Sequence, residues 1–286
     1  MTPRTPFHGH AVSFAVCLMV LPACGHDAGP KHLLRYAFEP GKVAHAVMTN
    51  RTTTKAKMGG ELMESSIDMQ MFLSSTVVEV RDGVAQLRLV IERMKVTTKG
   101  PGPAIDYDSD VEGSDPGPLK TTGSVIGKVM EMRVDMRGRV RDAKVPDELK
   151  AAANGFDFDQ MSHQQFQLLP EEPVAIGATW QEEVSMSVGP MGKSKVRTKC
   201  ELQKVEGGKA TLGLEMQMDL GDTKMPGGMK MQIEQASGTS IIDLSGWLPE
   251  GTMDMVMTTK GANMEMRMEH KATTQPCEAP KKTKPK

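Results

Sequence analysis

The chain has few aromatic residues, no surplus of charge of either sign and no familiar catalytic motif. Of its 286 residues only 4% are Phe, Trp or Tyr, and the formal net charge is −1. This balance argues against the concentrated basic surface that nucleic-acid binding requires. The histidines are scattered without metal-ligand spacing, and no Gly-x-Ser-x-Gly elbow or phosphate-binding glycine loop occurs. We therefore expect no enzyme, no metal, no cofactor and no nucleic-acid partner.

A strand pattern extends along nearly the whole chain. Apolar and polar residues alternate in Met130–Val134, Leu214–Met218 and Met264–Met268, and short segments containing Gly or Pro separate such runs. In a strand this alternation places the apolar side chains on one sheet face, which predicts a mainly β, antiparallel protein. Residues 146–169 are the exception, because Pro146 and the acidic residues after it are typical of a helix start. We expect a short helical or irregular connector there.

The two halves of the chain resemble each other. Val80–Leu89 parallels Val205–Leu214, and Val134–Val140 parallels Ile242–Leu248, so each half holds a hairpin followed by a strand ending in Asp-x-x-Gly. We expect duplicated antiparallel sheets in a sandwich or an open half-barrel; chance similarity between hairpins is the alternative. The predicted organisation is a signal peptide (1–23), a tether (24–32), a first β-unit (33–145), the connector (146–169), a second β-unit (170–277) and a disordered basic tail (278–286).

The N-terminal segment resembles the signal of a bacterial lipoprotein. The apolar run from Ala11 to Leu21 is long enough for a signal-peptide core and too short to span a bilayer. Cys24 then stands where a lipobox has its lipidated cysteine, which predicts a cell-envelope protein anchored in the membrane. Pro22 departs from the lipobox pattern, so secretion after cleavage near Ala23 is the alternative. Gly25, in place of an Asp that marks inner-membrane retention in some bacteria, favours the outer membrane.

Two cysteines remain after the signal peptide and the anchor are set aside. They are Cys200 and Cys277. In an oxidising compartment a single remaining pair most simply forms a disulfide, which would fix the C-terminal end onto a strand. Two free thiols are the alternative.

Several short motifs together resemble a protein family. They are Arg81–Ala85, Tyr107–Ser109, Asp135–Val140, Leu169-Pro170 and Gly177–Trp180, in that order. In this order they look like an uncharacterised family of secreted, β-rich bacterial lipoproteins, known only as a domain of unknown function. The resemblance covers roughly residues 33–270 and implies an exported β-rich domain. It carries over no catalytic or binding residue.

Methionine is unusually frequent, with 25 residues. The candidates for a continuous apolar sheet face are Met130, Met132, Met216, Met218, Met264, Met266 and Met268. Such residues can fill a core, form a deformable wall for hydrophobic ligands, or bind Cu(I) through their thioether sulfurs. Successive residues on one face of a strand are about 6.6 Å apart, so a single strand does not focus Met264, Met266, Met268 and His270 on one ion.

Together these patterns predict a non-enzymatic, lipid-anchored envelope protein. Its Met-rich sheet face would bind or carry a hydrophobic small molecule or a lipid. A purely structural or interaction role in the envelope, and Met-based Cu(I) handling, are the alternatives. The protein partner in the envelope is not indicated by the sequence.

Overall fold

The structure, a computed structural model, describes residues 29–102, 104–115, 117, 123–147, 165–187, 193–219, 230–261 and 264–280. These residues are mainly β. The strands are β1 (Val43–Met58), β2 (Glu61–Arg81), β3 (Val84–Lys99), β4 (Asp106–Asp108), β5 (Val129–Asp135), β6 (Val140–Lys144), β7 (Thr179–Ser187), β8 (Lys193–Glu206), β9 (Lys209–Asp219), β10 (Lys230–Asp243), β11 (Glu250–Lys260) and β12 (Met264–Pro276).

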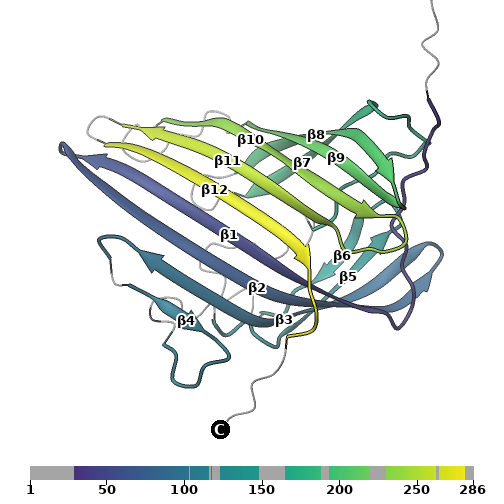
Figure 1. Cartoon of the computed structure of the whole chain (residues 1–286), viewed down its shortest axis with the longest axis horizontal. Coiled ribbons are helices and arrows are strands. Elements are labelled where there is room, and N and C mark those ends of the chain that lie inside the picture. Colours follow the sequence, from purple (N-terminus) through teal and green to yellow (C-terminus); the bar gives the residue numbers. More distant parts are fainter. Residues whose placement is uncertain are drawn as a thin grey trace, which may run out of the picture.

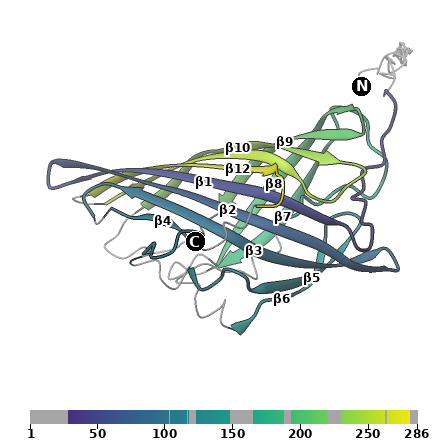
Figure 2. The same cartoon turned by 60° about the horizontal axis from the view of Figure 1, so that its bottom comes forward.

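All of these strands belong to one antiparallel sheet. Its order is β6-β5-β3-β2-β1-β12-β11-β10-β9-β8-β7, with β4 added beside β3. Figure 1 looks onto β12, β1 and β2, and the strands near both edges, β5–β6 and β7–β8, recede behind them. The same curvature is visible after the 60° rotation of Figure 2. The expected mainly β, antiparallel class is confirmed, but the sandwich is wrong: the two halves share one open, curved sheet.

The two halves join because the first strand pairs with the last. β1 pairs with β2 on one side and with β12 on the other, and the β1–β12 register runs from Ala46 opposite Pro276 to Met58 opposite Met264. A long antiparallel ladder of this kind satisfies the backbone groups that would otherwise form a free edge on each half. The continuous sheet therefore depends on contacts between residues more than 200 positions apart.

The predicted helical connector, residues 146–169, lies for the most part outside the described residues. The described residues at its C-terminal end, 165–169, are not helical. This segment crosses between the two halves: the Leu169 N–H donates to the Arg137 carbonyl at 2.8 Å, and the Trp180 indole N–H donates to the Leu168 carbonyl at 2.8 Å. The residues expected to continue the helix after Asp147 lie outside the described residues, so the helix is not supported. The residues beyond Pro280, at the end of the predicted basic tail, also lie outside the described residues.

The same hairpin turn occurs in both halves. The β2–β3 turn uses Asp82 (φ 51°) and Gly83 (φ 72°), and the β8–β9 turn uses Gly207 (φ 58°) and Gly208 (φ 76°). Positive φ at both central residues belongs to the two-residue turn whose twist suits a β-hairpin, and it favours Asp-Gly and Gly-Gly. A register irregularity precedes each turn, between Val77 and Glu79 and between Leu202 and Lys204.

The backbone hydrogen bonds around these hairpins repeat as well. The Gly41 N–H donates to the Val77 carbonyl at 2.8 Å, and the Gly177 N–H donates to the Leu202 carbonyl at 2.7 Å. After β5 and β10, the side chain of the strand's last residue, Asp135 or Asp243, accepts from the backbone N–H two residues later. These repeated contacts agree with the duplication seen in the sequence.

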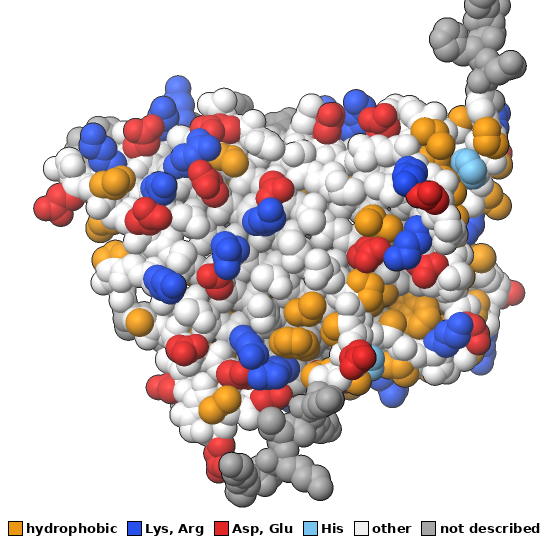
Figure 3. All heavy atoms as spheres, viewed as in Figure 1, with side chains coloured by type: hydrophobic (Ala, Val, Ile, Leu, Met, Phe, Trp, Pro, Cys, Tyr) orange, Lys and Arg blue, Asp and Glu red, His pale blue; other side chains and the backbone are white. Residues whose placement is uncertain are grey.

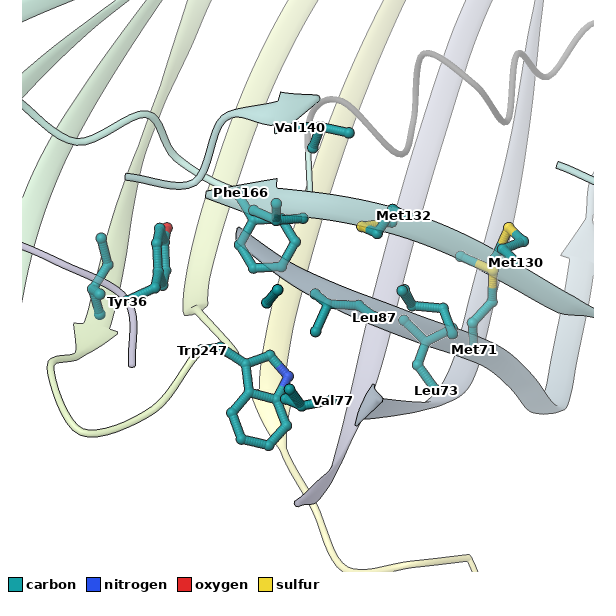
Figure 4. Packing of buried hydrophobic residues seen from close by; sticks show 14 of the residues in the cluster. Tyr36, Met71, Leu73, Val77, Leu87, Met130, Met132, Val140, Phe166 and Trp247 are labelled. Carbon is teal, nitrogen blue, oxygen red and sulfur yellow. The ribbon is translucent and has the colours of Figure 1, made fainter. Parts of the chain in front are cut away.

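An aromatic cluster fills one end of the concave face, which we call the packed end. It is the end that carries the turns at 82–83, 136–138, 207–208 and 244–246. Tyr36 is fully buried there, and its ring meets Phe166 edge-on at a centroid distance of 5.3 Å. Its hydroxyl donates to the Gln167 carbonyl (3.2 Å) and accepts from the Gln167 N–H (3.1 Å). Figure 4 shows Tyr36 and Phe166 together with Leu87, Met132 and Trp247 in this core.

The segment that contributes Tyr36 contacts both halves. The Tyr36 N–H donates to the Met136 carbonyl, and the next N–H, of Ala37, donates to the Gly246 carbonyl, each at 2.8 Å. These acceptors belong to the two equivalent Asp-x-x-Gly turns. The segment before β1 thus ties the turns of the two halves together across the curved sheet.

The predicted disulfide is wrong. Cys200 and Cys277 are both free. Cys200 lies in β8 and Cys277 follows β12, and β9, β10 and β11 separate these strands. Neighbouring strands are about 4.8 Å apart, whereas a disulfide requires Cα atoms within about 7 Å. The number of cysteines in a sequence says nothing about the distance between them.

Gly138 is a position where a side chain has no room. Its φ is +86°, and an added Cβ would lie 2.7 Å from both the Gln167 carbonyl oxygen and Cε2 of Tyr36. We expect Gly138→Ala to cost about 1–2 kcal/mol for the left-handed backbone and about 1–3 kcal/mol more for overpacking. Gly177→Ala is the matched control, because its φ is +85° with nothing within 4 Å of the added Cβ. Urea unfolding that shows equal losses for the two variants would contradict this packing.

The two thiols are expected to differ in reactivity. Cys200 is fully buried, and this burial raises the pKa of its thiol to about 12, whereas Cys277 is partly exposed. In a chain carrying Cys17→Ser and Cys24→Ser, a maleimide should label Cys277 in the native protein and Cys200 only after denaturation. Mass spectrometry counts the labels. A denatured, unreduced sample that takes up no label would show that the two cysteines are bonded.

Candidate ligand-binding site

The two faces of the sheet differ in chemistry. On β12, Met264, Met266, Met268 and His270 point to the concave face and are partly buried, while the four residues that alternate with them are charged and exposed. Neighbouring strands continue the charged pattern on the convex face, which Figure 3 shows carrying side chains of both signs over β12 and β1. Ion pairs such as Lys260–Glu265 (3.0 Å) and Arg267–Glu269 (3.1 Å) lie on this side. The alternation inferred from the sequence thus separates an apolar inner wall from a charged outer wall.

The candidate methionines fall into two groups on the inner wall. Met130 and Met132 are 3% and 2% exposed and belong to the packed core. Met216, Met218, Met264, Met266 and Met268 are only partly buried. The first two are therefore core residues, and the other five form a wall that the chain's described side chains leave partly uncovered.

A cavity of about 320 Å³ lies on the inner wall of the second half. Its volume is at the lower end of the range typical of small-molecule sites. The described residues that line it are Gln165, Phe166, Gln167, Glu182, Val184, Val196, Thr198, Leu214, Met216, Thr239, Ser240, Pro249, Glu250, Gly251, Thr252, Met253, Ala272 and Thr274. The cavity therefore spans strands β7 to β12 and is bounded by the end of the connector.

The register explains how residues far apart in the chain meet there. Glu182 of β7 lies opposite Thr198 of β8, and Thr198 lies opposite Met216 of β9. Next to this row, the β9–β10 ladder ends at Glu215 opposite Ser237, although both strands continue. Met216 is the first residue of β9 beyond that ladder. Its side chain lines the cavity at the point where the hydrogen-bonded pairing between β9 and β10 ends.

Glu182 gives the cavity its acidic character. Desolvation by burial raises the pKa of this carboxyl, while a hydrogen bond from the Leu168 backbone and the charge of Arg139 oppose the rise. The other acid at the cavity, Glu250, accepts a 2.9 Å hydrogen bond from Lys209. The described lining contains no Lys or Arg. A bound apolar molecule would therefore meet hydrogen-bond acceptors and the carboxyl group of Glu182 here.

The structure also brings together a group that the sequence did not indicate. The Cys277 N–H donates to the His45 carbonyl at 2.9 Å, and Nδ1 of His45 lies 3.6 Å from Oε2 of Glu92. Burial and the Glu92 charge raise the pKa of the Cys277 thiol. These residues are more than 40 positions apart, so no local motif could have signalled the cluster.

In the part of the chain that the structure describes, no three His, Cys, Asp or Glu side chains are grouped to hold a metal ion. Within the same ranges, no helix has the length and apolar character needed to cross a membrane. The predicted anchor, Cys24, and the whole signal peptide lie outside the described residues.

Residues 142–248 match the Family of unknown function (DUF6263). The match runs from within β6 to just beyond β10 and therefore covers most of the second half, including much of the cavity. It supports the expected similarity to an uncharacterised family and assigns no function. None of the curated proteins compared with the chain matches it significantly.

Solved structures resemble the chain only weakly. Lipovitellin, in a structure concerned with its lipid–protein interactions, matches with a TM-score of 0.47 and 12% identity over 86% of this chain. The chain spans 26% of that protein. The translocator domain of the autotransporter NalP from Neisseria meningitidis gives a TM-score of 0.28 and 6% identity over 81% of this chain and 88% of that one. OpdQ of Pseudomonas aeruginosa gives 0.28 and 6% over 82% and 99%. Similarities this weak do not bear on function.

Proposed function

We propose that this protein is a lipid-anchored envelope protein of non-enzymatic role that binds or carries a hydrophobic ligand on its concave sheet face. The observation that carries the proposal is the cavity of about 320 Å³ next to a wall of partly buried methionines. Flexible thioether side chains adapt to ligands of different shape, which suits a carrier better than a rigid aromatic wall would. The buried Met130 and Met132 leave no room for a ligand on their part of the first half, so we place the ligand on the second half of the face.

The polarity of the cavity supports a particular class of ligand. Glu182, Thr198 and Ser240 supply hydrogen-bond acceptors, and no basic side chain stands among the described lining residues. An anionic head group, such as a fatty-acid carboxylate, would meet an unfavourable charge here. The cavity therefore suits an apolar molecule with an amine or hydroxyl head group.

The anchor and the location complete the proposal. A lipidated Cys24 would hold the domain at the membrane through several acyl chains, and Gly25 favours the outer membrane. A purely structural or interaction role remains the second candidate. The aromatic core, which fills the packed end with the chain's own side chains, favours that role for this end of the sheet.

Dodecylamine binding followed by calorimetry tests the ligand site. We expect Met216→Asn to weaken binding about tenfold, because a polar amide on an apolar wall costs about 1–3 kcal/mol. Met58→Asn is the matched control: Met58 lies at the far end of β1 with 49% of its surface exposed, and its replacement should leave binding unchanged. Equal effects of the two variants would place the ligand elsewhere.

The same assay separates head groups. The unmodified chain should bind dodecylamine and dodecanol better than dodecanoate, and Glu182→Gln should reduce the preference for the amine over the alcohol. Stronger binding of dodecanoate would overturn the assignment of the head group. Binding of none of the three would overturn the proposed carrier role.

Metabolic labelling with a fatty acid tests the anchor. The full chain expressed in a bacterium should incorporate the label and fractionate with membranes, and Cys24→Ser should abolish both properties because its hydroxyl cannot form the thioether. Cys17→Ser is the control, since it changes a cysteine inside the signal peptide without touching the lipobox. Labelling that survives Cys24→Ser would contradict the proposed anchor.

A further inference from the structure

Two cross-strand pairs bring soft ligand atoms together on the concave face. In the β11–β12 register, Met255 lies opposite His270 and Met257 lies opposite Met268. Residues directly opposite each other in an antiparallel pair have Cβ atoms about 4.5–5.5 Å apart, closer than successive residues on the same face of one strand. All four side chains are partly buried. The pairing thus gathers three thioethers and one imidazole in a way that β12 alone does not.

The imidazole is held by the next strand. Nδ1 of His270 lies 2.9 Å from the hydroxyl oxygen of Thr52, its partner across the β1–β12 ladder. With Nδ1–H donating to that oxygen, the lone pair of Nε2 is free to bind a ligand. Metal-binding histidines are commonly oriented by such a hydrogen bond from the second ring nitrogen.

The surroundings select the kind of ion. The inner-face neighbours on the adjacent strands are Thr54, Ile233 and Ala236, while the charged residues of β12 alternate onto the convex face. Hard divalent ions require carboxylate or carbonyl oxygens, whereas thioether sulfur and imidazole suit soft ions. A monovalent ion also loses less hydration energy than a divalent one on entering an apolar wall.

We propose that Met255, Met257, Met268 and His270 form a binding site for a soft monovalent cation, Cu(I) or Ag(I), with Thr52 positioning the imidazole. The site lies beside the hydrophobic-ligand cavity and is independent of that function. It differs from a copper site on Met264, Met266 and Met268, because two of its four ligands come from β11.

The test is an anaerobic Cu(I) titration of the full chain against a competing chelator. We expect one tight equivalent, and at least tenfold weaker binding in Met257→Leu/Met268→Leu and in His270→Leu. Leucine is close to methionine in volume, so these Met variants should keep their fold. The matched control is Met58→Leu/Met63→Leu, which removes the same number of thioethers from the far end of β1 and β2 and should bind as the unmodified chain does.

Thr52 and the methyl groups of methionine give independent measurements. Thr52→Val should weaken Cu(I) binding about tenfold, whereas Thr52→Ser keeps the hydroxyl and the affinity. In methyl-labelled protein, one equivalent of Ag(I) should shift the NMR signals of Met255, Met257 and Met268 and leave that of Met63 in place.

Three results would overturn the proposal. Unchanged Cu(I) affinity in the Met257→Leu/Met268→Leu variant would show that these two thioethers are not ligands. An equal loss in the Met58/Met63 control would mean that the ion binds methionines without a defined site. Unchanged Cu(I) affinity in His270→Leu would show that the imidazole is not a ligand and that Thr52 has no positioning role.

Discussion

The curved shape of the sheet depends on the short segment around Tyr36. Through two successive backbone N–H groups it binds the Asp-x-x-Gly turns of both halves, and its buried aromatic ring packs between them. In an open sheet the two edge strands, here β6 and β7, do not pair with each other. Only contacts across the concave side can therefore hold these two edges near each other. The Tyr36 hydroxyl, which both donates to and accepts from the Gln167 backbone, adds the connector to the same cluster.

The scarcity of aromatic residues has a direct structural consequence. Tyr36, Phe38, Phe166 and Trp247 all pack in or against the core at one end of the concave face. Aromatic side chains supply the most volume per residue, so their concentration fills that end, and much of the inner face of the second half is left to methionine, threonine and alanine. Both the cavity and the proposed soft-metal site lie on parts of the face that the aromatic cluster does not fill. Composition and position together therefore determine where the inner wall stays accessible.

Local sequence patterns predicted the strands, the hairpin turns and the repetition between Val80–Leu89 and Val205–Leu214, because all of these are short-range features. They did not predict the single sheet, since the pairing of β1 with β12 links residues at opposite ends of the chain. The disulfide prediction was wrong for the same reason. An even number of remaining cysteines says nothing about the distance between them, and three strands separate Cys200 from Cys277. Met130 and Met264 both begin a Met-Glu-Met-Arg pattern, and only contacts with distant parts of the chain decide that the first is buried and the second is partly exposed.

The place of β12 in the sheet determines whether the two repeated units run in the same direction, because this depends on whether the number of strands between equivalent positions is odd or even. The two repeated units, β1-β2-β3-β5-β6 and β7-β8-β9-β10-β11, each contribute five strands to an order in which every neighbour runs antiparallel. Five is odd, so two such units set directly side by side would point in opposite directions, and their Asp-x-x-Gly turns would lie at opposite ends. The extra strand between β1 and β11 makes the spacing between equivalent strands six, which is even. The two copies of a five-stranded unit therefore run in the same direction, with their Asp-x-x-Gly turns at the same end of the concave face, only because the single unrepeated strand β12 lies between them.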